Sequence, residues 1–300
     1  MNLGEIAHCL DERFNVQRFI ELANWDFALS PRARESLISR GSATFRSTFN
    51  GLLNGEGERH IDRAYLVVFP EASLLDQIVA LEVARGRLGA LILTHHPCDM
   101  ETSGRGFMPI ADEQLDRMRD ANIALFVLHA PLDCHAEIST SGALADGLGL
   151  RRTSVFAPYV GGYAGIIGEQ EPEPFAAFAD RVRRVCELPY FMPNQVRFNG
   201  RMVSKVAILA GGGDDIGELK AAQLLGADMF LAGHWWTPHI GEWADRNRAA
   251  IAELLPKLSM NLLSGSHDGS ELVVFRDRLV PLIEELGLDV HLIRQADHWR

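Results

Sequence analysis

The sequence predicts an α/β protein with two lobes, each built on a mostly parallel sheet flanked by helices. Short apolar segments of strand length alternate with longer segments of helical periodicity, first over residues 64–128 and again over residues 203–293. Such alternation is typical of right-handed βαβ units, whose strands are parallel. We place the division between the lobes after residue 165, which gives a first lobe of residues 1–165 and a second of residues 166–300.

The composition limits the possible partners. The chain has 300 residues, of which 47% are hydrophobic, and a formal net charge of −11. This is enough for one large or two modest domains with their own cores. An acidic chain without a basic patch does not suit nucleic acid or an anionic membrane, which need cationic side chains. The amino terminus lacks the pattern of a signal peptide, so we expect a cytoplasmic protein.

The chain begins with predicted helices, and after residue 60 predicted strands alternate with predicted helices. Residues 1–60 predict three helices and a glycine-rich loop, and no chemistry is assigned to them. Apolar runs bounded by turn residues predict the strands, at residues 64–69, 90–94, 123–128, 152–156, 164–167, 203–209, 229–232, 258–263 and 290–293. Helical spacing of apolar residues predicts helices at residues 72–84, 111–119, 141–148, 175–186, 216–225, 242–255 and 270–286. The segment 169–174, rich in Pro and Glu, is interpreted as the connection between the lobes.

The first feature to carry chemistry is a predicted strand that ends on two adjacent histidines, His95 and His96. Pro97 follows and cannot continue a central strand, so the histidines fall at the carboxyl end, where open α/β sheets bind ligands. Side chains alternate along an extended backbone. The two imidazoles are therefore expected to point to opposite sides and to serve two ions, or one ion and its substrate.

Two other predicted strands also end in groups of possible metal ligands. One leads into His129 and Asp133, and a later one leads into His267 and Glu271. His267 and Glu271 are four residues apart, so they share a helix face if a helix begins near His267. Nitrogen and oxygen donors of this kind suit Zn, Fe, Mn or Co. Taken singly, each group also fits a structural role, such as a hydrogen-bonded histidine pair or a helix cap, but their recurrence at strand ends favours a metal site.

The combined motifs resemble the Ngg-interacting-factor-three-like family, whose members are often labelled GTP cyclohydrolase type 2 proteins. The resemblance covers roughly residues 60–290. In order, the motifs are THHP at residues 94–97, HxxLD at 129–133, GALAxxLGL at 142–150, VAILAGGG at 206–213, GAD at 226–228 and HxxxE at 267–271.

The resemblance implies a two-lobed subunit with a dinuclear metal centre in the cleft at the carboxyl ends of the strands. It also implies a homo-oligomer, a toroidal hexamer whose sites face an internal cavity. By their positions in the motifs, the ligands of two divalent ions per subunit (Zn, Fe, Mn or Co) are His95, His96, Asp133, His267 and Glu271.

The chain also departs from the family pattern near these ligands. Family members usually have an aspartate just after the first strand, where this chain has Phe69-Pro70-Glu71. They have Gly-Glu where it has Gly233-His234, and a glycine where Ser266 precedes His267. The five ligands are retained while their surroundings change. This combination favours retained metal chemistry with a different substrate.

The leading functional hypothesis is a dinuclear metal-dependent hydrolase acting on a small substrate, either nucleotide-like or a cyclic amide. His129 and His234 are the predicted acid–base residues, and His135 and His239 are further candidates for orienting or proton-transfer roles. The alternative is a non-catalytic metal-binding or metal-delivery protein, for which the acid–base histidines are dispensable. An iron-dependent oxidase is a third hypothesis.

Three secondary features are further candidates for a role at the site. Gly211-Gly212-Gly213 forms either a phosphate cradle or a tight turn capped by an aspartate. Trp235-Trp236 is either a stacking platform for a flat substrate or a packing contact between subunits. Arg105 is a candidate for pairing with an anionic group of the substrate.

Overall fold

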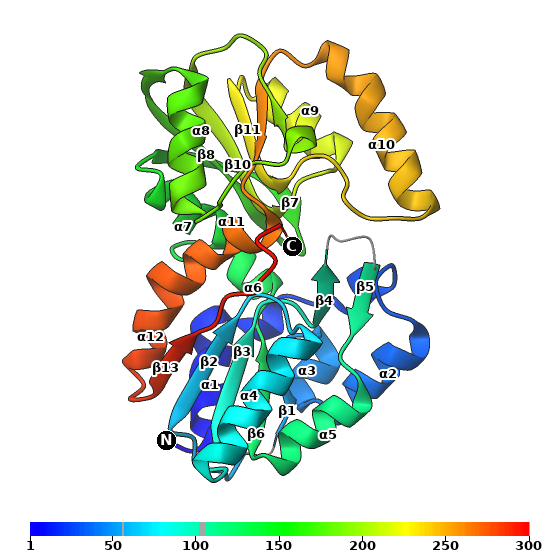
Figure 1. Cartoon of the computed structure of the whole chain (residues 1–300), viewed down its shortest axis with the longest axis vertical. Coiled ribbons are helices and arrows are strands. Elements are labelled where there is room, and N and C mark those ends of the chain that lie inside the picture. Colours follow the sequence, from blue (N-terminus) through cyan, green and yellow to red (C-terminus); the bar gives the residue numbers. More distant parts are fainter. Residues whose placement is uncertain (56, 102–105, 300) are drawn as a thin grey trace. The chain divides into compact units, whose positions relative to one another are not determined.

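The computed structural model describes residues 1–55, 57–101 and 106–299 (Figure 1). Arg105, the predicted partner of an anionic group, lies outside the described residues. The chain forms two compact units. The first comprises Met1–Met100, Phe107–His135 and Phe275–Gln295, and the second consists chiefly of Ala136–Val274. This division differs from the one predicted after residue 165, because the chain leaves the first unit at His135 and later returns to it.

The first unit contains a five-stranded sheet in the order β1-β6-β3-β2-β13. Its strands are β1 (Gly51–Asn54), β2 (Arg63–Val67), β3 (Ala90–Thr94), β6 (Ile123–Val127) and β13 (Asp289–Leu292). Only β1 runs antiparallel to its neighbour, so this sheet is mostly parallel, as predicted. Two strands differ from the sequence prediction: β1 lies in the predicted glycine-rich loop, and β13, expected in the second lobe, pairs with β2.

Helices cover both faces of this sheet. Figure 1 shows α4 and α5 on one face and α1 and α3 on the other. The helical segments of the first unit are α1 (Leu3–Phe14), η1 (Val16–Arg18), η2 (Leu22–Trp25), α2 (Pro31–Arg40), α3 (Ala43–Thr48), α4 (Ala72–Arg85), α5 (Asp112–Asp120), α6 (Ala130–Asp133), η5 (Phe275–Leu279) and α12 (Val280–Glu284). The chain begins α1 with a capping box, in which Asn2 and Glu5 each accept a hydrogen bond from the other's backbone N–H. A two-stranded sheet of β4 (Cys98–Glu101) and β5 (Gly106–Pro109) follows β3 along the chain.

The second unit contains a six-stranded sheet in the order β7-β8-β10-β11-β12-β9. Its strands are β7 (Arg151–Tyr159), β8 (Gly162–Glu173), β9 (Val196–Arg197), β10 (Val203–Gly212), β11 (Met229–His234) and β12 (Asn261–Ser264). Only β10, β11 and β12 are mutually parallel. The sheet is therefore mixed, which corrects the prediction of a mostly parallel sheet, because β7 and β8 form an antiparallel hairpin and β9 joins the other edge.

The segment 169–174 was interpreted as a connection between lobes, but most of it belongs to β8. The ladder between β7 and β8 ends at the pair Arg151 and Glu169, whereas the ladder with β10 continues to Glu173. Proline is tolerated in a strand where its missing N–H faces no partner. Pro172 meets this condition because it lies beyond the end of the β7 ladder.

The remaining helices pack on the second sheet. They are α7 (Thr140–Gly147), η3 (Pro193–Gln195), α8 (Phe175–Val185), α9 (Ile216–Leu224), α10 (Glu242–Leu254), η4 (Leu255–Lys257) and α11 (His267–Val274). Figure 1 shows α9 and α10 on one face of the sheet and α7, α8 and α11 on the other. The long helix predicted over residues 270–286 is divided into α11, the π-helical turn η5 and α12. The chain passes from the second unit to the first at this turn.

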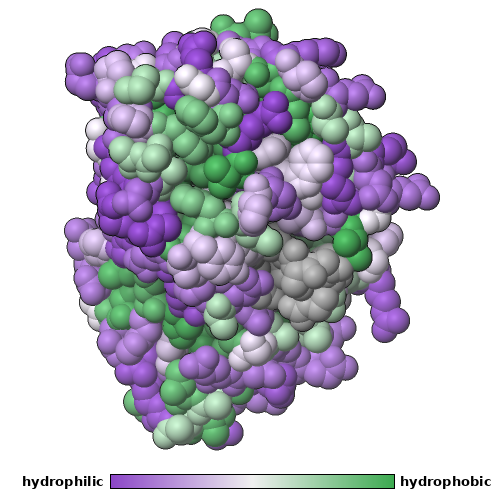
Figure 2. Space-filling model, turned by 45° about the horizontal axis from the view of Figure 1, so that its top comes forward, coloured by the Kyte–Doolittle hydropathy of each residue, from purple (hydrophilic) through white to green (hydrophobic). Residues whose placement is uncertain are grey.

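One face of the molecule carries polar residues over much of its area (Figure 2). Figure 2 shows them over most of the face in view, interrupted by smaller apolar areas. No helix among the described residues is both long enough and apolar enough to cross a membrane.

The core of the second unit supplies a stability test with a matched control. Leu231 in β11 is fully buried, whereas Leu224 at the end of α9 is 88% exposed. We expect Leu231→Ala to lower the free energy of unfolding by about 2–5 kcal/mol, because it removes buried methyl groups and leaves a cavity. The same change at Leu224 should alter it by less than about 0.5 kcal/mol. Urea denaturation of both variants checks this, and equal losses would contradict the assigned core.

Candidate functional site

Four predicted site residues of the first unit lie together at the carboxyl ends of the neighbouring strands β3 and β6. We call His95, His96, His129 and Asp133 the first-unit cluster; all four are at least nine-tenths buried. Each of the three histidines offers a ring nitrogen, and these nitrogens lie within 4.8 Å of one another. The Nε2 atom of His95 lies 3.4 Å from Oδ1 of Asp133. Their grouping fits the predicted placement at strand ends.

The expectation that His95 and His96 point to opposite sides is corrected. Their ring centroids are only 4.5 Å apart. In a regular strand, consecutive residues bond to opposite neighbours. Here both backbone N–H groups donate to the same neighbouring segment, His95 to the carbonyl of Val67 at the end of β2 and His96 to that of Val68, the next residue. The backbone has therefore turned beyond Thr94, which brings the two imidazoles together.

Neighbouring groups fix the rings of this cluster. The Nδ1 of His95 lies 2.7 Å from the carbonyl oxygen of Leu128. A carbonyl only accepts, so Nδ1 carries the proton and the Nε2 of neutral His95 carries a lone pair. The ring of His96 stacks on Phe69 with 4.3 Å between centroids and 7° between planes. Phe69 thus supports the ring of His96.

A residue that the sequence analysis missed lies behind His129. Glu21 is fully buried, and its Oε1 lies 2.7 Å from Nδ1 of His129. Its Oε2 accepts hydrogen bonds from the side chain of Asn50 at 2.6 Å and from the N–H of Ala130 at 3.1 Å. Asn50 also accepts a bond from the N–H of His129 at 2.7 Å. The amino-terminal region therefore contributes to the site, although no chemistry was assigned to it.

The two partners shift each other's pKa. Burial opposes ionisation of Glu21, but the charge of His129 and the hydrogen bonds from His129, Asn50 and Ala130 hold the pKa of this carboxyl below its usual value. Burial likewise opposes protonation of His129, yet the Glu21 carboxylate raises the pKa of the imidazole above its usual value. Glu21 is thus an ionised acceptor, and Nδ1 of His129 is the donor.

In the second unit, the predicted site residues gather after β11 and β12. We call His234, His267 and Glu271 the second-unit cluster. The helix α11 begins at His267, as the spacing required, and Nε2 of His267 lies 3.2 Å from Oε1 of Glu271. The rings of His234 and His267 are 5.1 Å apart. The predicted sharing of one helix face by His267 and Glu271 is confirmed.

His234, predicted as an acid–base residue, is a buried histidine whose ring lacks, within the part of the chain that the structure describes, the hydrogen bonds that buried polar groups usually have. Neither ring nitrogen has a hydrogen-bond partner among the described residues. Its Nδ1 lies 3.6 Å from a carboxylate oxygen of Asp214. Burial, together with His267 and His239, lowers the pKa of His234 to about 3, against the effect of Asp214. The imidazole is therefore neutral near pH 7 and has one lone pair and one N–H to offer.

A cavity of about 230 Å³ opens beside His234 and His267 within the second unit. The remaining lining is partly apolar and partly amide, and consists of Met192, Asn194, Gln195, Gly233, Pro238 and Trp299. Gln195 is held by hydrogen bonds with Trp236 and Ser264, so this wall is fixed. The cavity has the size of a small ligand, somewhat below that of a usual drug-sized site.

Other predicted features are resolved by the structure. Gly211 and Gly212 end β10, and Asp215 caps the helix that follows, because it accepts hydrogen bonds from the N–H groups of Gly217 and Glu218. Trp235 belongs to the hydrophobic core of the second unit and is 4% exposed, so it is not a stacking platform. His135 packs edge-on against Phe14 of α1.

The buried donors fit a metal ion chemically. Imidazole nitrogens and carboxylate oxygens form the mixed set preferred by Zn, Fe, Mn and Co. Within the first unit, His95, His96 and His129 are grouped so that they can hold an ion. The model of the protein family described as Duf34/NIF3 (NGG1p interacting factor 3) matches residues 42–294 of the chain.

The chain belongs to this family.

Individual relatives agree with the assignment. A protein of Halobacterium salinarum named "GTP cyclohydrolase 1 type 2 homolog" is 30% identical over 190 residues, which are 61% of this chain and 70% of the relative. The fold of this NIF3 protein is similar to that of "protein ybgI, unknown function" (TM-score 0.65, 20% identity) and of TTHA1606 from Thermus thermophilus (TM-score 0.62, 19% identity). Each of these likenesses covers 99% of both chains.

One NIF3 glycine has a steric role that a substitution tests. Gly211 has a positive φ of 80°, and a Cβ there would lie 2.2 Å from Oε1 of Glu271 and 3.0 Å from Nε2 of His267. The neighbouring Gly212 does not have a φ in the left-handed region that favours glycine. Among the described residues, a Cβ there would have no contact closer than His234, at 3.8 Å. We expect Gly211→Ala to displace the second-unit cluster and to cost about 1–3 kcal/mol of stability from the backbone alone.

The control for this prediction is Gly212→Ala, which should be much less destabilising. Urea denaturation measures both changes, and a crystal structure of the Gly211 variant shows whether Glu271 has moved. Equal stability of the two variants would contradict the close approach of Gly211 to Glu271.

Proposed function

We propose that this NIF3 protein is a dinuclear metal-dependent hydrolase that acts on a small substrate. Its metal ligands in this proposal are the five residues implied by the family motifs, namely His95, His96, Asp133, His267 and Glu271. When bound, two divalent ions supply Lewis-acid activation of water and of a substrate oxygen. The observation that carries the proposal is that every one of these side chains is buried on the segment that follows the carboxyl end of a strand, with other nitrogen or oxygen donors beside it.

Several observations support hydrolysis over metal binding or delivery without catalysis. The curated relative named above carries the name of a cyclohydrolase. The cavity beside His267 offers space for a small molecule next to a proposed ligand. Among the described residues, the cavity is lined by amide, imidazole and apolar groups, and none of these lining residues is a lysine or an arginine. This lining favours an uncharged, flat portion of substrate, such as a heterocyclic or cyclic amide ring.

His234 is the residue best suited to proton transfer in this cavity. It is a lining residue, and burial keeps its imidazole neutral. A neutral imidazole can accept a proton at one nitrogen and donate one at the other, as a general acid–base group does, and with a pKa of about 3 it holds the extra proton only transiently. His129, the other predicted acid–base residue, is held through Nδ1 by Glu21, and its Nε2 lies 4.0 Å from Oδ2 of Asp133, one of the proposed ligands.

Elemental analysis of the wild type beside Glu271→Ala tests the metal centre. We expect about two equivalents of Zn, Fe, Mn or Co per chain in the wild type, as a two-metal site requires, and a clear loss in the variant. His267→Ala serves as a second variant, because it removes the imidazole whose Nε2 lies 3.2 Å from Glu271. Absence of metal from the wild type, even after reconstitution, would show that the buried cluster is structural.

Hydrolysis is tested with the metal-loaded wild type against nucleotides, phosphate esters and cyclic amides. We expect activity that chelator treatment removes and that the added ion restores. His234→Gln should retain the metal and lose about 10²–10⁴-fold in turnover, the usual contribution of a general acid–base group. Normal turnover in this variant would refute its assigned role, and a loaded protein inactive on every substrate class would favour metal binding or delivery without catalysis.

A further inference from the structure

The first unit presents more nitrogen donors than the family motifs assign to a metal. The motif-based ligands of this unit are His95, His96 and Asp133, and His129 was predicted as an acid–base residue. In the structure the ring of His129 lies 4.7 Å from that of His95 and 4.9 Å from that of His96, between centroids. The three rings form one group of ligand nitrogens within 4.8 Å. His129 is thus almost as close to the two motif histidines as they are to each other.

The orientation of each ring indicates which nitrogen faces the group. Nδ1 of His95 donates to the Leu128 carbonyl, and Nδ1 of His129 donates to the Glu21 carboxylate. In both residues this leaves Nε2 as the atom for a ligand. Metal-binding histidines usually donate their other N–H to a carbonyl or a carboxylate, which fixes the ring and increases the basicity of the ligating nitrogen. His95 has the arrangement with a carbonyl, and His129 has the arrangement with a carboxylate.

The charges around the group also favour a cation. Two carboxylates face His129: Glu21 through Nδ1, and Asp133, whose Oδ2 lies 4.0 Å from Nε2. Both are buried, and Glu21 has no exposed surface at all. A divalent ion at the histidines would balance the two negative charges, because buried charges require compensation.

We infer that His129 is a further metal ligand beside the five of the proposed function and that Glu21 is the positioning residue that holds its ring, so that the first unit supplies three histidine ligands, His95, His96 and His129. The inference rests on the metal-binding part of the proposed function. Glu21 lies outside the segment that matches the family model, which starts at residue 42. The carboxylate that positions His129 is therefore supplied by a part of the chain beyond the family match.

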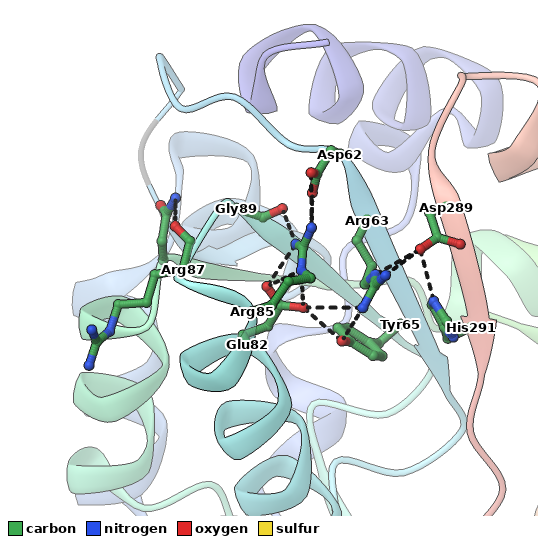
Figure 3. A network of polar contacts seen from close by, with 10 residues as sticks. Asp62, Arg63, Tyr65, Glu82, Arg85, Arg87, Gly89, Asp289 and His291 are labelled. Carbon is green, nitrogen blue, oxygen red and sulfur yellow. Dashed lines mark hydrogen bonds and ion pairs between the residues drawn. The ribbon is translucent and has the colours of Figure 1, made fainter.

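The chain offers a matched control for the loss of a buried carboxylate. Glu82 in α4 belongs to the same unit and is also fully buried. Figure 3 shows its carboxylate between Tyr65 and Arg85, with hydrogen bonds of 2.7 Å to the Tyr65 hydroxyl and of 2.7 Å to Nη2 of Arg85. Both Glu82 and Glu21 are satisfied internal carboxylates, but only Glu21 contacts a histidine of the first-unit cluster.

The experiment is a titration of the metal-free full-length protein with Co²⁺, followed by its visible absorption and by competition with a chelator. The variants are Glu21→Gln, His129→Ala and Glu82→Gln. Gln has one acceptor oxygen, whereas Glu21 accepts on both oxygens, so Glu21→Gln must lose the bond either from His129 or from Asn50 and Ala130. We expect a loss of Co²⁺ affinity of about 10- to 100-fold, typical of removing a residue that orients a ligand. His129→Ala should lose at least as much and change the absorption spectrum.

The control separates binding from stability. Glu82→Gln should lower the urea midpoint and leave the Co²⁺ affinity unchanged. Unchanged affinity in both Glu21→Gln and His129→Ala would overturn the inference, whatever their stability. Loss of hydrolysis by these variants with normal Co²⁺ binding would also overturn it and would assign His129 to proton transfer. A wild type that binds Co²⁺ but hydrolyses nothing would refute only the proposed hydrolase, because the affinities are measured without a substrate.

Discussion

The site depends on a buried carboxylate that must have its partners. An ionised carboxylate removed from water is destabilising by several kcal/mol unless hydrogen bonds and an opposite charge compensate it. Glu21 obtains its hydrogen bonds from His129, Asn50 and the backbone of Ala130. Asn50 immediately precedes β1, and the other two groups belong to the turn after β6. The chain before β1 therefore has to fold against the strand ends, and in doing so it fixes the ring of His129.

The second unit satisfies its buried polar groups in another way. His234 has no hydrogen-bond partner at either ring nitrogen within the described chain, and it avoids the cost of a buried charge by staying neutral. Glycines, which have no side chain, leave space for the close packing of the backbone around this residue. A Cβ at Gly233 would lie 2.2 Å from the carbonyl oxygen of Gly211, and one at Gly211 would lie equally close to Glu271. The glycines at these strand ends allow β10, β11 and α11 to approach closely.

Much of this architecture could be predicted from the sequence because its signals are local. The apolar run before His95 predicted β3 with its observed limits, and the spacing of His267 and Glu271 predicted a shared helix face. The failures involve partners distant in sequence. Glu21 and His129 are 108 residues apart, and nothing near Glu21 indicates a buried carboxylate. The pairing of β13 with β2 is equally remote, and the composition of residues 169–174 concealed a strand that has a neighbour on one side only.

Ser266 and His234 affect the second-unit cluster in different ways. The φ of Ser266 is 59°, which is in the left-handed region that favours glycine. The serine compensates part of that strain, because its Oγ accepts a hydrogen bond of 2.7 Å from the N–H of Gly269 and so supports the start of α11. His267 and Glu271 consequently keep a common face. By contrast, His234 is an imidazole that burial keeps neutral, so it adds no charge to the cavity that it lines. The serine thus supports the turn that presents His267 and Glu271, while the neutral imidazole keeps the adjoining wall of the cavity polar and uncharged.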